Sequence, residues 1–230
     1  MKIAGLQKTS LIDYPDKVAA IVFTQGCPFR CGYCYNPELL PLQSDKLFST
    51  QVILDFLVRR KKVLDALVIT GGEPTLQKDL PQFIKKVKAL GYLVKLDTNG
   101  TNPEMLKQLI STKTIDYIAM DIKAPIKDYS RVVNVKVDEA KIKKSIKLIM
   151  NSGLGYEFRS TILPRLHTKE DLVQMAKLIK GAKRYYLQKF LPQGGKLQDP
   201  SFGQAKSFTD KEMKDLALAG AEFVEKCEVR

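Results

Sequence analysis

The sequence predicts an α/β fold in which a β-strand and an α-helix alternate six times along 230 residues. Two observations lead to this prediction. Short apolar runs rich in β-branched residues recur along the chain, and each is followed by a segment whose apolar residues repeat at helical spacing. Strands and helices that alternate in this way form parallel β/α units. No change of composition divides the chain, so we expect residues 1–230 to form a single domain.

The predicted elements follow one another along the whole chain. The strands are expected at residues 18–24, 67–70, 93–96, 115–120, 155–163 and 184–190. The helices are expected at residues 50–63, 80–90, 139–151 and 169–181, with two more that begin at residues 103 and 210. Asn102 before Pro103, and the pair Thr209 and Glu212, are typical helix beginnings.

Three of the four cysteines lie in one short loop after the first predicted strand, as Cys27-x3-Cys31-x2-Cys34. The chain begins without the apolar stretch of a signal peptide and holds no apolar run long enough to span a membrane. We therefore expect a cytoplasmic protein whose reduced thiols bind metal. An iron–sulfur cluster and zinc both suit clustered thiolates, but a closed zinc site needs four ligands and this loop offers three. Cys227 is expected to be a structural thiol on the apolar face of the last helix.

Three further unusual segments each follow a predicted strand. They are Gly71-Gly72-Glu73-Pro74, Asp97-Thr98-Asn99-Gly100 and the stretch from Asp121 to Pro125. The carboxyl ends of parallel strands meet at one edge of a sheet, so we expect these segments to converge on one site with the cysteine loop. Arg159 lies in an otherwise apolar strand and needs a partner, either a ligand group or an aspartate in the core. His167, the single histidine, is expected on a surface loop without a functional role.

The formal net charge is +13, which allows an acidic partner such as nucleic acid. The lysines are scattered over most of the predicted helices, so a solvated, lysine-rich surface is the favoured interpretation. Hydrophobic residues make up 44% of the chain and charged residues 27%, as in ordinary globular proteins. We expect no contact with a membrane.

The motifs and their order resemble the radical S-adenosylmethionine (SAM) superfamily. The cysteine loop, with Tyr33 before the third cysteine, is followed by the Gly-Gly-Glu-Pro segment. Residues 5–15, 36–39, 97–100 and 121–125 also resemble the anaerobic ribonucleoside-triphosphate reductase activating proteins, which are relatives of the pyruvate formate-lyase activating enzymes. The similarity extends to about Pro192. It implies a partial, open (β/α)6 TIM-like barrel with the site at the carboxyl-terminal rim of the strands.

The resemblance implies that Cys27, Cys31 and Cys34 hold a 4Fe-4S cluster whose fourth iron binds the amino and carboxylate groups of SAM. Tyr33 is expected beside the adenine. The backbone at Gly71 and Gly72 is expected to accept hydrogen bonds from the SAM ammonium, together with Glu73 and Pro74.

The second and third strand-end segments are also assigned to SAM by the resemblance. Asp97, Thr98 and Asp121 match positions that, in the pyruvate formate-lyase activators, help hold a monovalent cation beside the SAM carboxylate. The same resemblance places Asn99 against the methionyl end of SAM, and Lys123 matches a SAM-contacting lysine. Arg159 is a further candidate. Two residues depart from the family pattern, since Tyr35 and Gln193 stand where relatives have histidine.

The activity implied by the resemblance is reductive cleavage of SAM to methionine and a 5′-deoxyadenosyl radical. A donor such as flavodoxin or ferredoxin would supply the electron. The radical would abstract hydrogen from a glycine of a partner enzyme, an anaerobic ribonucleotide reductase, with residues 124–135 and 191–207 in contact with it. Two alternatives remain open. One is a radical SAM enzyme that acts on a small molecule or RNA, and the other is a non-catalytic zinc or iron–sulfur protein.

Overall fold

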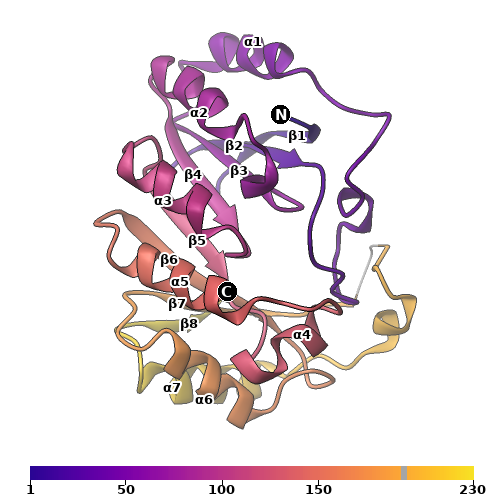
Figure 1. The fold of residues 1–230 in the computed structure, drawn as a ribbon. Coiled ribbons are helices and arrows are strands. Elements are labelled where there is room, and N and C mark those ends of the chain that lie inside the picture. The colour runs from indigo at the N-terminus through magenta and orange to yellow at the C-terminus, as the bar shows by residue number, and fades with distance from the viewer. Residues whose placement is uncertain (193–195) are drawn as a thin grey trace.

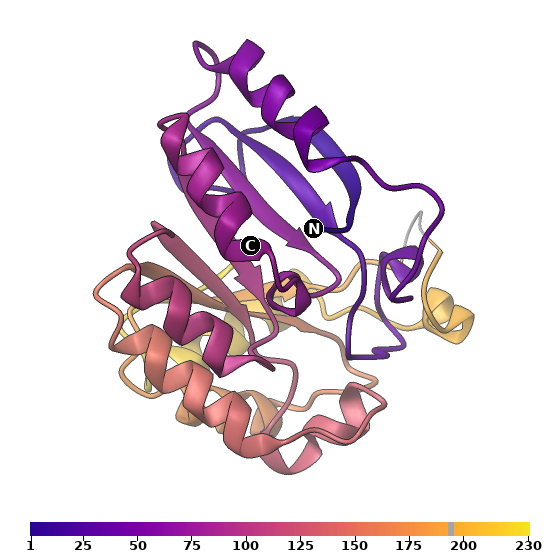
Figure 2. The same cartoon turned by 45° about the horizontal axis from the view of Figure 1, so that its top comes forward.

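The computed structural model describes residues 1–192 and 196–230, which form one open, curved sheet with helices on its outer side (Figures 1 and 2). The eight strands lie side by side in chain order, from β1 to β8. This is the expected partial, open (β/α)6 barrel, extended by one strand at each edge. Gln193 lies outside the described residues.

All six predicted strands are present, and each lies parallel to its neighbours among them. They are β2 (Ala19–Thr24), β3 (Ala66–Gly71), β4 (Leu93–Thr98), β5 (Tyr117–Asp121), β6 (Gly155–Ile162) and β7 (Tyr185–Lys189). Because the strands are parallel, their carboxyl ends share one rim. Gly71, Thr98 and Asp121 end three neighbouring strands and therefore meet at this rim.

The six predicted helices are also present. They are α1 (Thr50–Arg60), α2 (Leu80–Ala89), α3 (Pro103–Ser111), α5 (Glu139–Met150), α6 (Lys169–Leu178) and α7 (Asp210–Ala221). The Asn102 side chain accepts a hydrogen bond from the amide of Met105, and Thr209 and Glu212 form the predicted capping box. A short helix, α4 (Tyr129–Val132), precedes α5. Within the described ranges, no helix has the length and apolar character needed to cross a membrane.

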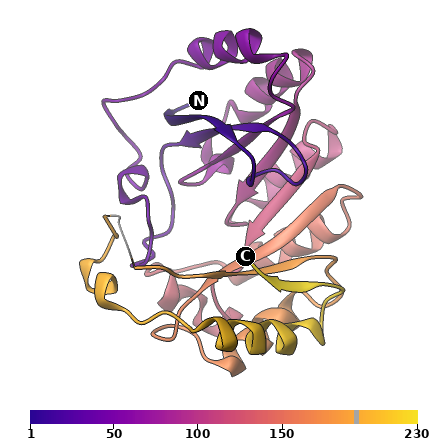
Figure 3. The same cartoon turned by 180° about the vertical axis from the view of Figure 1, so that it is seen from behind.

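Two edge strands lie outside the six predicted β/α units. The first is β1 (Ile3–Ser10), which pairs antiparallel with β2, and the second is β8 (Cys227–Val229), which pairs parallel with β7. The barrel stays open between these edges (Figure 3). The prediction that Cys227 lies on the last helix was wrong, because α7 ends at Ala221 and the chain returns to the sheet. Its side chain is half-buried against Gly220 of that helix.

The two faces of the sheet differ in chemistry. On β4, Val94 and Leu96 belong to the large apolar core between the sheet and its helices. Lys95 and Asp97 alternate with them, and they form ion pairs with each other and with Glu157 and Arg159 of β6. A small apolar cluster that includes Tyr14 and Tyr117 forms a second core. The interior of the barrel is therefore partly ionic, and these charges lead up to the rim.

Candidate functional site

A cavity of about 230 Å³ opens at the carboxyl-terminal rim. Every predicted site residue except Pro74 lines it, and the complete predicted set in the lining is Cys27, Cys31, Tyr33, Cys34, Gly71, Gly72, Glu73, Asp97, Thr98, Asn99, Asp121, Lys123 and Arg159. The rim therefore brings together residues from five separate segments, as expected for parallel strands. The lining also holds residues that were not predicted: Phe29, Tyr35, Asn36, Leu40, Thr70 and Thr161.

The cysteine loop presents three free thiols to this cavity. Cys27 and Cys31 are buried, and Cys34 is half-buried. Burial raises the pKa of Cys27 to about 12 and that of Cys31 to about 11. Buried thiols that must act as thiolates need a positive group beside them. In the described part of the chain, no three Cys, His, Asp or Glu side chains converge as they would around a single ion. Three thiols spaced around a cavity fit a cluster with several irons better than one zinc ion.

The inner side of the cysteine loop is held by an arginine. Nη1 of Arg30 donates hydrogen bonds to the carbonyls of Cys27 and Phe29, both at 2.7 Å. The amide of Arg30 donates to the carbonyl of Val133 at 2.9 Å, and Asn134 donates to the carbonyl of Arg30 at 3.1 Å. Residues 124–135, which were expected to contact a partner, thus support the cluster loop. Their contact with a partner stays a prediction.

The outer side of the cysteine loop is covered by residues 196–204, which we call the strap (Figure 1). The amide of Asp199 donates to the carbonyl of Gly32 at 2.9 Å, and the amide of Gln198 donates to the carbonyl of Cys34 at 3.2 Å. Phe202 of the strap packs so closely on Gly32 that a Cβ atom there would lie 2.5 Å from its ring. Any larger residue in place of Gly32, between the second and third cysteines, would therefore have to displace the Phe202 ring.

Tyr33 lies between the strap and the barrel. Its ring packs against Phe190 and Phe202 and is 3% exposed. This leaves little of the ring surface for the expected contact with adenine, which stays a prediction. The Tyr33 hydroxyl is buried and finds no hydrogen-bond partner among the described residues. A buried hydroxyl without a partner is costly, which fits a site that is completed by a ligand.

Tyr35, which replaces the family histidine, joins the cysteine loop to the end of β7. Its ring stacks on Phe190 with the ring centres 5.4 Å apart. Its hydroxyl donates to the carbonyl of Leu191 at 3.1 Å and accepts from the amide of Leu191 at 2.8 Å. Tyr35 therefore orients the loop through backbone contacts.

Glu73 joins the first two strand-end segments. Its buried carboxylate accepts hydrogen bonds from the amide and hydroxyl of Thr75, the hydroxyl of Thr98 and the amide of Asn99. Burial raises the pKa of Glu73, although these hydrogen bonds oppose the rise. All four of these hydrogen bonds come from the protein itself, so the carboxylate of Glu73 holds the shape of the turn. The amide of Gly72 donates to the carbonyl of Thr24 at 2.9 Å and a Cβ atom at Gly72 would clash with the carbonyl of Gly26, so contact of a ligand with the carbonyls of Gly71 and Gly72 stays a prediction.

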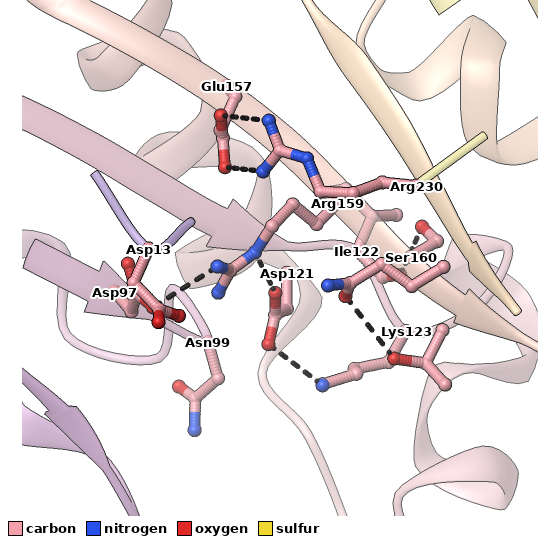
Figure 4. A network of polar contacts seen from close by, with 12 residues as sticks. Asp13, Asp97, Asn99, Asp121, Ile122, Lys123, Glu157, Arg159, Ser160 and Arg230 are labelled. Carbon is pink, nitrogen blue, oxygen red and sulfur yellow. Dashed lines mark hydrogen bonds and ion pairs between the residues drawn. The ribbon is translucent and has the colours of Figure 1, made fainter. Parts of the chain in front are cut away.

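The ends of β4, β5 and β6 carry an array of charges (Figure 4). Nη1 of Arg159 lies 3.1 Å from Oδ2 of Asp97, and its Nε lies 3.0 Å from Oδ1 of Asp121. Nζ of Lys123 lies 3.0 Å from Oδ2 of Asp121. Burial alone would raise the pKa of Asp121, but Lys123 and Arg159 hold it at about 2. Arg159 was expected to pair either with a ligand group or with an aspartate of the core, and the structure shows pairs with Asp97 and Asp121.

His167 is a site residue that the sequence did not reveal. The prediction of a surface position was wrong, because the ring is 2% exposed. Its Nδ1 accepts from the amide of Leu163 at 3.4 Å, so Nε2 carries the hydrogen and donates to the carbonyl of Lys123 at 2.9 Å. Burial lowers the pKa of His167 and favours this neutral form. His167 therefore fixes the backbone beneath Lys123.

Fold and site together define a radical SAM protein. The model of the radical SAM superfamily matches residues 21–184, and the chain belongs to this superfamily. Its members use a 4Fe-4S cluster and SAM, and the three cysteines and the cavity beside them fit both groups. The chain is thus a radical SAM enzyme, and the zinc alternative is set aside.

The curated relatives are more specific. The chain is 34% identical, over 99% of its length and 95% of the relative, to a Methanocaldococcus jannaschii protein that is provisionally named a glycyl-radical enzyme activating enzyme. It is 27% identical to the pyruvate formate-lyase-activating enzyme of Clostridium pasteurianum, over 83% of this chain and 81% of that protein. These relatives belong to the wider group of glycyl-radical enzyme activating proteins, and the narrower resemblance to activators of anaerobic ribonucleotide reductase stays a prediction.

Solved structures of low sequence identity share the fold. Streptococcus suis SuiB bound to its precursor peptide SuiA has a TM-score of 0.68 at 14% identity, over 91% of this chain and 48% of that chain. Archaeal TYW1 has a TM-score of 0.60 at 13% identity, over 90% of this chain and 72% of that chain. This chain therefore spans about half the length of SuiB, a structure that was also solved with SAM bound.

Proposed function

We propose that the chain activates a glycyl radical enzyme. The observation that carries this proposal is the meeting of the cysteine loop, the two turns joined by Glu73 and the charged strand ends in one cavity. Its support is the similarity to activating enzymes over 99% of the chain. The residues that resemble anaerobic ribonucleotide reductase activators favour that reductase as the partner. A flavodoxin or ferredoxin is the proposed electron donor, and the cytoplasm is the proposed compartment.

A cluster on Cys27, Cys31 and Cys34 together with SAM supplies one-electron chemistry, the cleavage of SAM to methionine and a 5′-deoxyadenosyl radical. The chain provides the binding and the shielding. Carbonyls at Gly71 and Gly72 would accept from the SAM ammonium, and Lys123 would attract its carboxylate.

Tyr33 lines the cavity and packs against Phe190 and Phe202 behind it, and these rings would exclude water from that side of the cavity. Exclusion of water matters because a reactive radical must meet its target before it meets solvent or another quencher. The open side of the barrel, between β1 and β8, would admit the glycine segment of the partner.

The first test is chemical. The protein is reconstituted with iron and sulfide without oxygen, reduced, and given SAM, and 5′-deoxyadenosine is measured. We expect product from the wild type and from Cys227→Ser, but none from Cys31→Ala. Product from Cys31→Ala would contradict the assignment of the cluster ligands.

The second test concerns the target. Anaerobic ribonucleotide reductase is added, and electron paramagnetic resonance measures the glycyl radical. We expect the radical only with SAM and the reduced activator. SAM cleavage without a radical on the reductase would overturn this partner. The proposed class would then change to a small-molecule or RNA substrate.

A further inference from the structure

We propose that this site binds SAM without a monovalent cation, because fixed protein cations already occupy the coordination places that such an ion would need. Sequence resemblance assigned a cation to Asp97, Thr98 and Asp121, and the three residues as they stand do not fit it. The inference concerns SAM binding alone, so it does not depend on the identity of the partner enzyme.

Every carboxylate oxygen at the two strand ends faces a cation of the protein, and Figure 4 shows the pairs with Arg159 and Lys123. Asp121 places Oδ1 at 3.0 Å from Arg159 and Oδ2 at 3.0 Å from Lys123. Asp97 places Oδ2 at 3.1 Å from Arg159 and Oδ1 at 3.1 Å from Nζ of Lys95. The order Lys95, Asp97, Arg159, Asp121, Lys123 is a line of alternating charge from the barrel interior to the cavity.

The contact between Lys95 and Asp97 is an ion pair at 3.1 Å, and Oδ1 of Asp97 has no hydrogen-bond partner among the described residues. Oδ1 of Asp97 is therefore the atom most open to competition by an ion from solution. A second cation there would lie within a few ångströms of the Lys95 ammonium, where like charges repel strongly in a buried site. We conclude that Lys95 excludes the ion by charge.

The hydroxyl of Thr98, the third expected ligand, is also engaged. It donates to Oε1 of Glu73 at 2.8 Å and accepts from the amide of Gly100 at 3.1 Å. One lone pair of the hydroxyl oxygen is left by these contacts, so Thr98 alone could offer an ion at most one coordination place. Alkali cations are held by several oxygen ligands at once, as other hard cations are. No oxygen among the expected ligands is left without a protein contact.

Lys95 itself is held from three sides. Its side chain is 1% exposed, and Nζ donates to the carbonyl of Asp13 at 2.6 Å. Oε1 of Glu157 lies 3.9 Å from the same nitrogen. Asp13 belongs to the turn between β1 and β2, part of the 5–15 stretch that resembles the activating proteins. This turn thus gains a role, since it tethers the positioning residue Lys95 beneath the site.

The charges also explain how an anionic ligand is accepted. The line contains three cations and two carboxylates, so within the line one positive charge is left over, although Lys95 lies outside the cavity lining and Glu73 adds a carboxylate to it. Two aspartates beside the carboxylate of SAM would repel it without such compensation. Here Lys95, Arg159 and Lys123 supply the compensation that a bound ion would supply elsewhere.

The deciding experiment measures the dissociation constant of SAM for the reconstituted wild-type enzyme in sodium, potassium or choline chloride at equal ionic strength. Choline cannot replace an alkali ion between carboxylates, because the choline ion is too large and its charge is covered by alkyl groups. We expect constants that agree within about twofold in all three salts. A constant at least tenfold weaker in choline, restored by potassium or sodium, would overturn the proposal.

Lys95→Met gives the complementary test, because it leaves Oδ1 of Asp97 without its cation. We expect SAM binding about tenfold weaker in choline and largely restored by potassium or sodium. Lys88→Met is the matched control. Lys88 of α2 pairs with Asp116, just before β5, and its loss should leave SAM binding independent of the salt. Equal binding by Lys95→Met in choline and potassium would count against the proposal.

The double variant Lys95→Met with Asp97→Asn removes both charges of the buried pair at once. No unpaired charge is then left inside the protein, so a folding defect is avoided. We expect the double variant to fold and to bind SAM with the same affinity in every salt, although more weakly than the wild type. A salt dependence in this variant would show that the ion binds elsewhere and would overturn the role given to Lys95. The wild-type series decides the main question even if Lys95→Met does not fold.

Discussion

Two carboxyl groups of the cavity, the buried Glu73 and the half-buried Asp121, are held in opposite electrostatic surroundings. The pKa of Glu73 is raised because burial outweighs its hydrogen bonds from neutral donors. The pKa of Asp121 is lowered, against the effect of burial, because two cations contact it. The difference follows from the partners of each group, and charged partners stabilise a carboxylate more than neutral ones do. Glu73 therefore holds the backbone of the two turns in place, while Asp121 holds the side chains of Lys123 and Arg159 in place.

Asp121 should make stability depend on pH. Asp121→Asn is expected to lower the free energy of unfolding by about 2 kcal/mol at neutral pH, from a shift of the ordinary value of 3.8 to about 2. Because the folded-state pKa is depressed, the stabilisation is complete above about pH 4 and is lost as the pH falls through about 2. Denaturant unfolding at several pH values measures it, with Asp45→Asn, at an exposed position, as the control. A difference between wild type and Asp121→Asn that stays constant down to pH 2 would show that Asp121 is not the titrating group.

At the scale of elements, the cluster loop is held between two segments that come from different parts of the chain. The segment with η3 (Ile126–Asp128), α4 and Asn134 contacts Arg30 on one side of the loop, and the strap with its turn η4 (Pro200–Gln204) contacts the other side. Neither segment contributes a cluster ligand. Their contacts go to the backbone of the loop, so they determine where the thiols lie.

The contact of the strap with Gly32 can be tested by one methyl group. Gly32→Ala should displace the Phe202 ring, lower the free energy of unfolding by about 1–3 kcal/mol and speed the loss of cluster absorbance in air. Gly203→Ala, in the same strap, is the control, because a Cβ atom at Gly203 meets no atom within 4 Å. If both variants lose the cluster at the wild-type rate, the strap does not shield it.

The sequence predicted the six parallel units well, because buried strands and amphipathic helices carry strong periodic signals. It did not predict β8, since three residues that include Glu228 form a strand only by pairing with β7. The convergence of the cysteines with Gly71, Asp97 and Asp121 was predictable from the rule that parallel strands end at one rim. The burial of His167 and the line from Lys95 to Lys123 were not predictable, because they depend on contacts between distant segments.

At the scale of the whole molecule, charged side chains connect the far edge of the sheet to its centre. Arg230, which follows β8, lies 3.1 Å from Glu157 of β6, and Glu157 is fully buried beside Lys95. The guanidinium of Arg230 also lies over the ring of Tyr186, 3.8 Å from its centre. The edge strand β8 is therefore part of the ionic interior and not an appendage of the barrel.

Loss of this edge contact should destabilise the whole fold. Arg230→Met is expected to lower the free energy of unfolding by about 1–3 kcal/mol, because the buried carboxylate of Glu157 would keep only its weaker contacts. Lys226→Met removes an exposed pair with Glu228 and should change stability by less than about 0.5 kcal/mol. Urea unfolding of both variants makes the comparison. Equal effects would mean that the Arg230 pair is only a surface contact.

The strap also fixes an order of events during synthesis. Phe202 is made 168 residues after Cys34, as the difference of their numbers shows. At about 5–20 residues per second, a ribosome needs roughly 10–30 s to cover that distance. During this interval the three thiols have left the ribosome or are leaving it, and nothing covers their outer side. The nascent chain thus has a period in which iron and sulfide can reach the cysteines, and it ends when the strap folds over them.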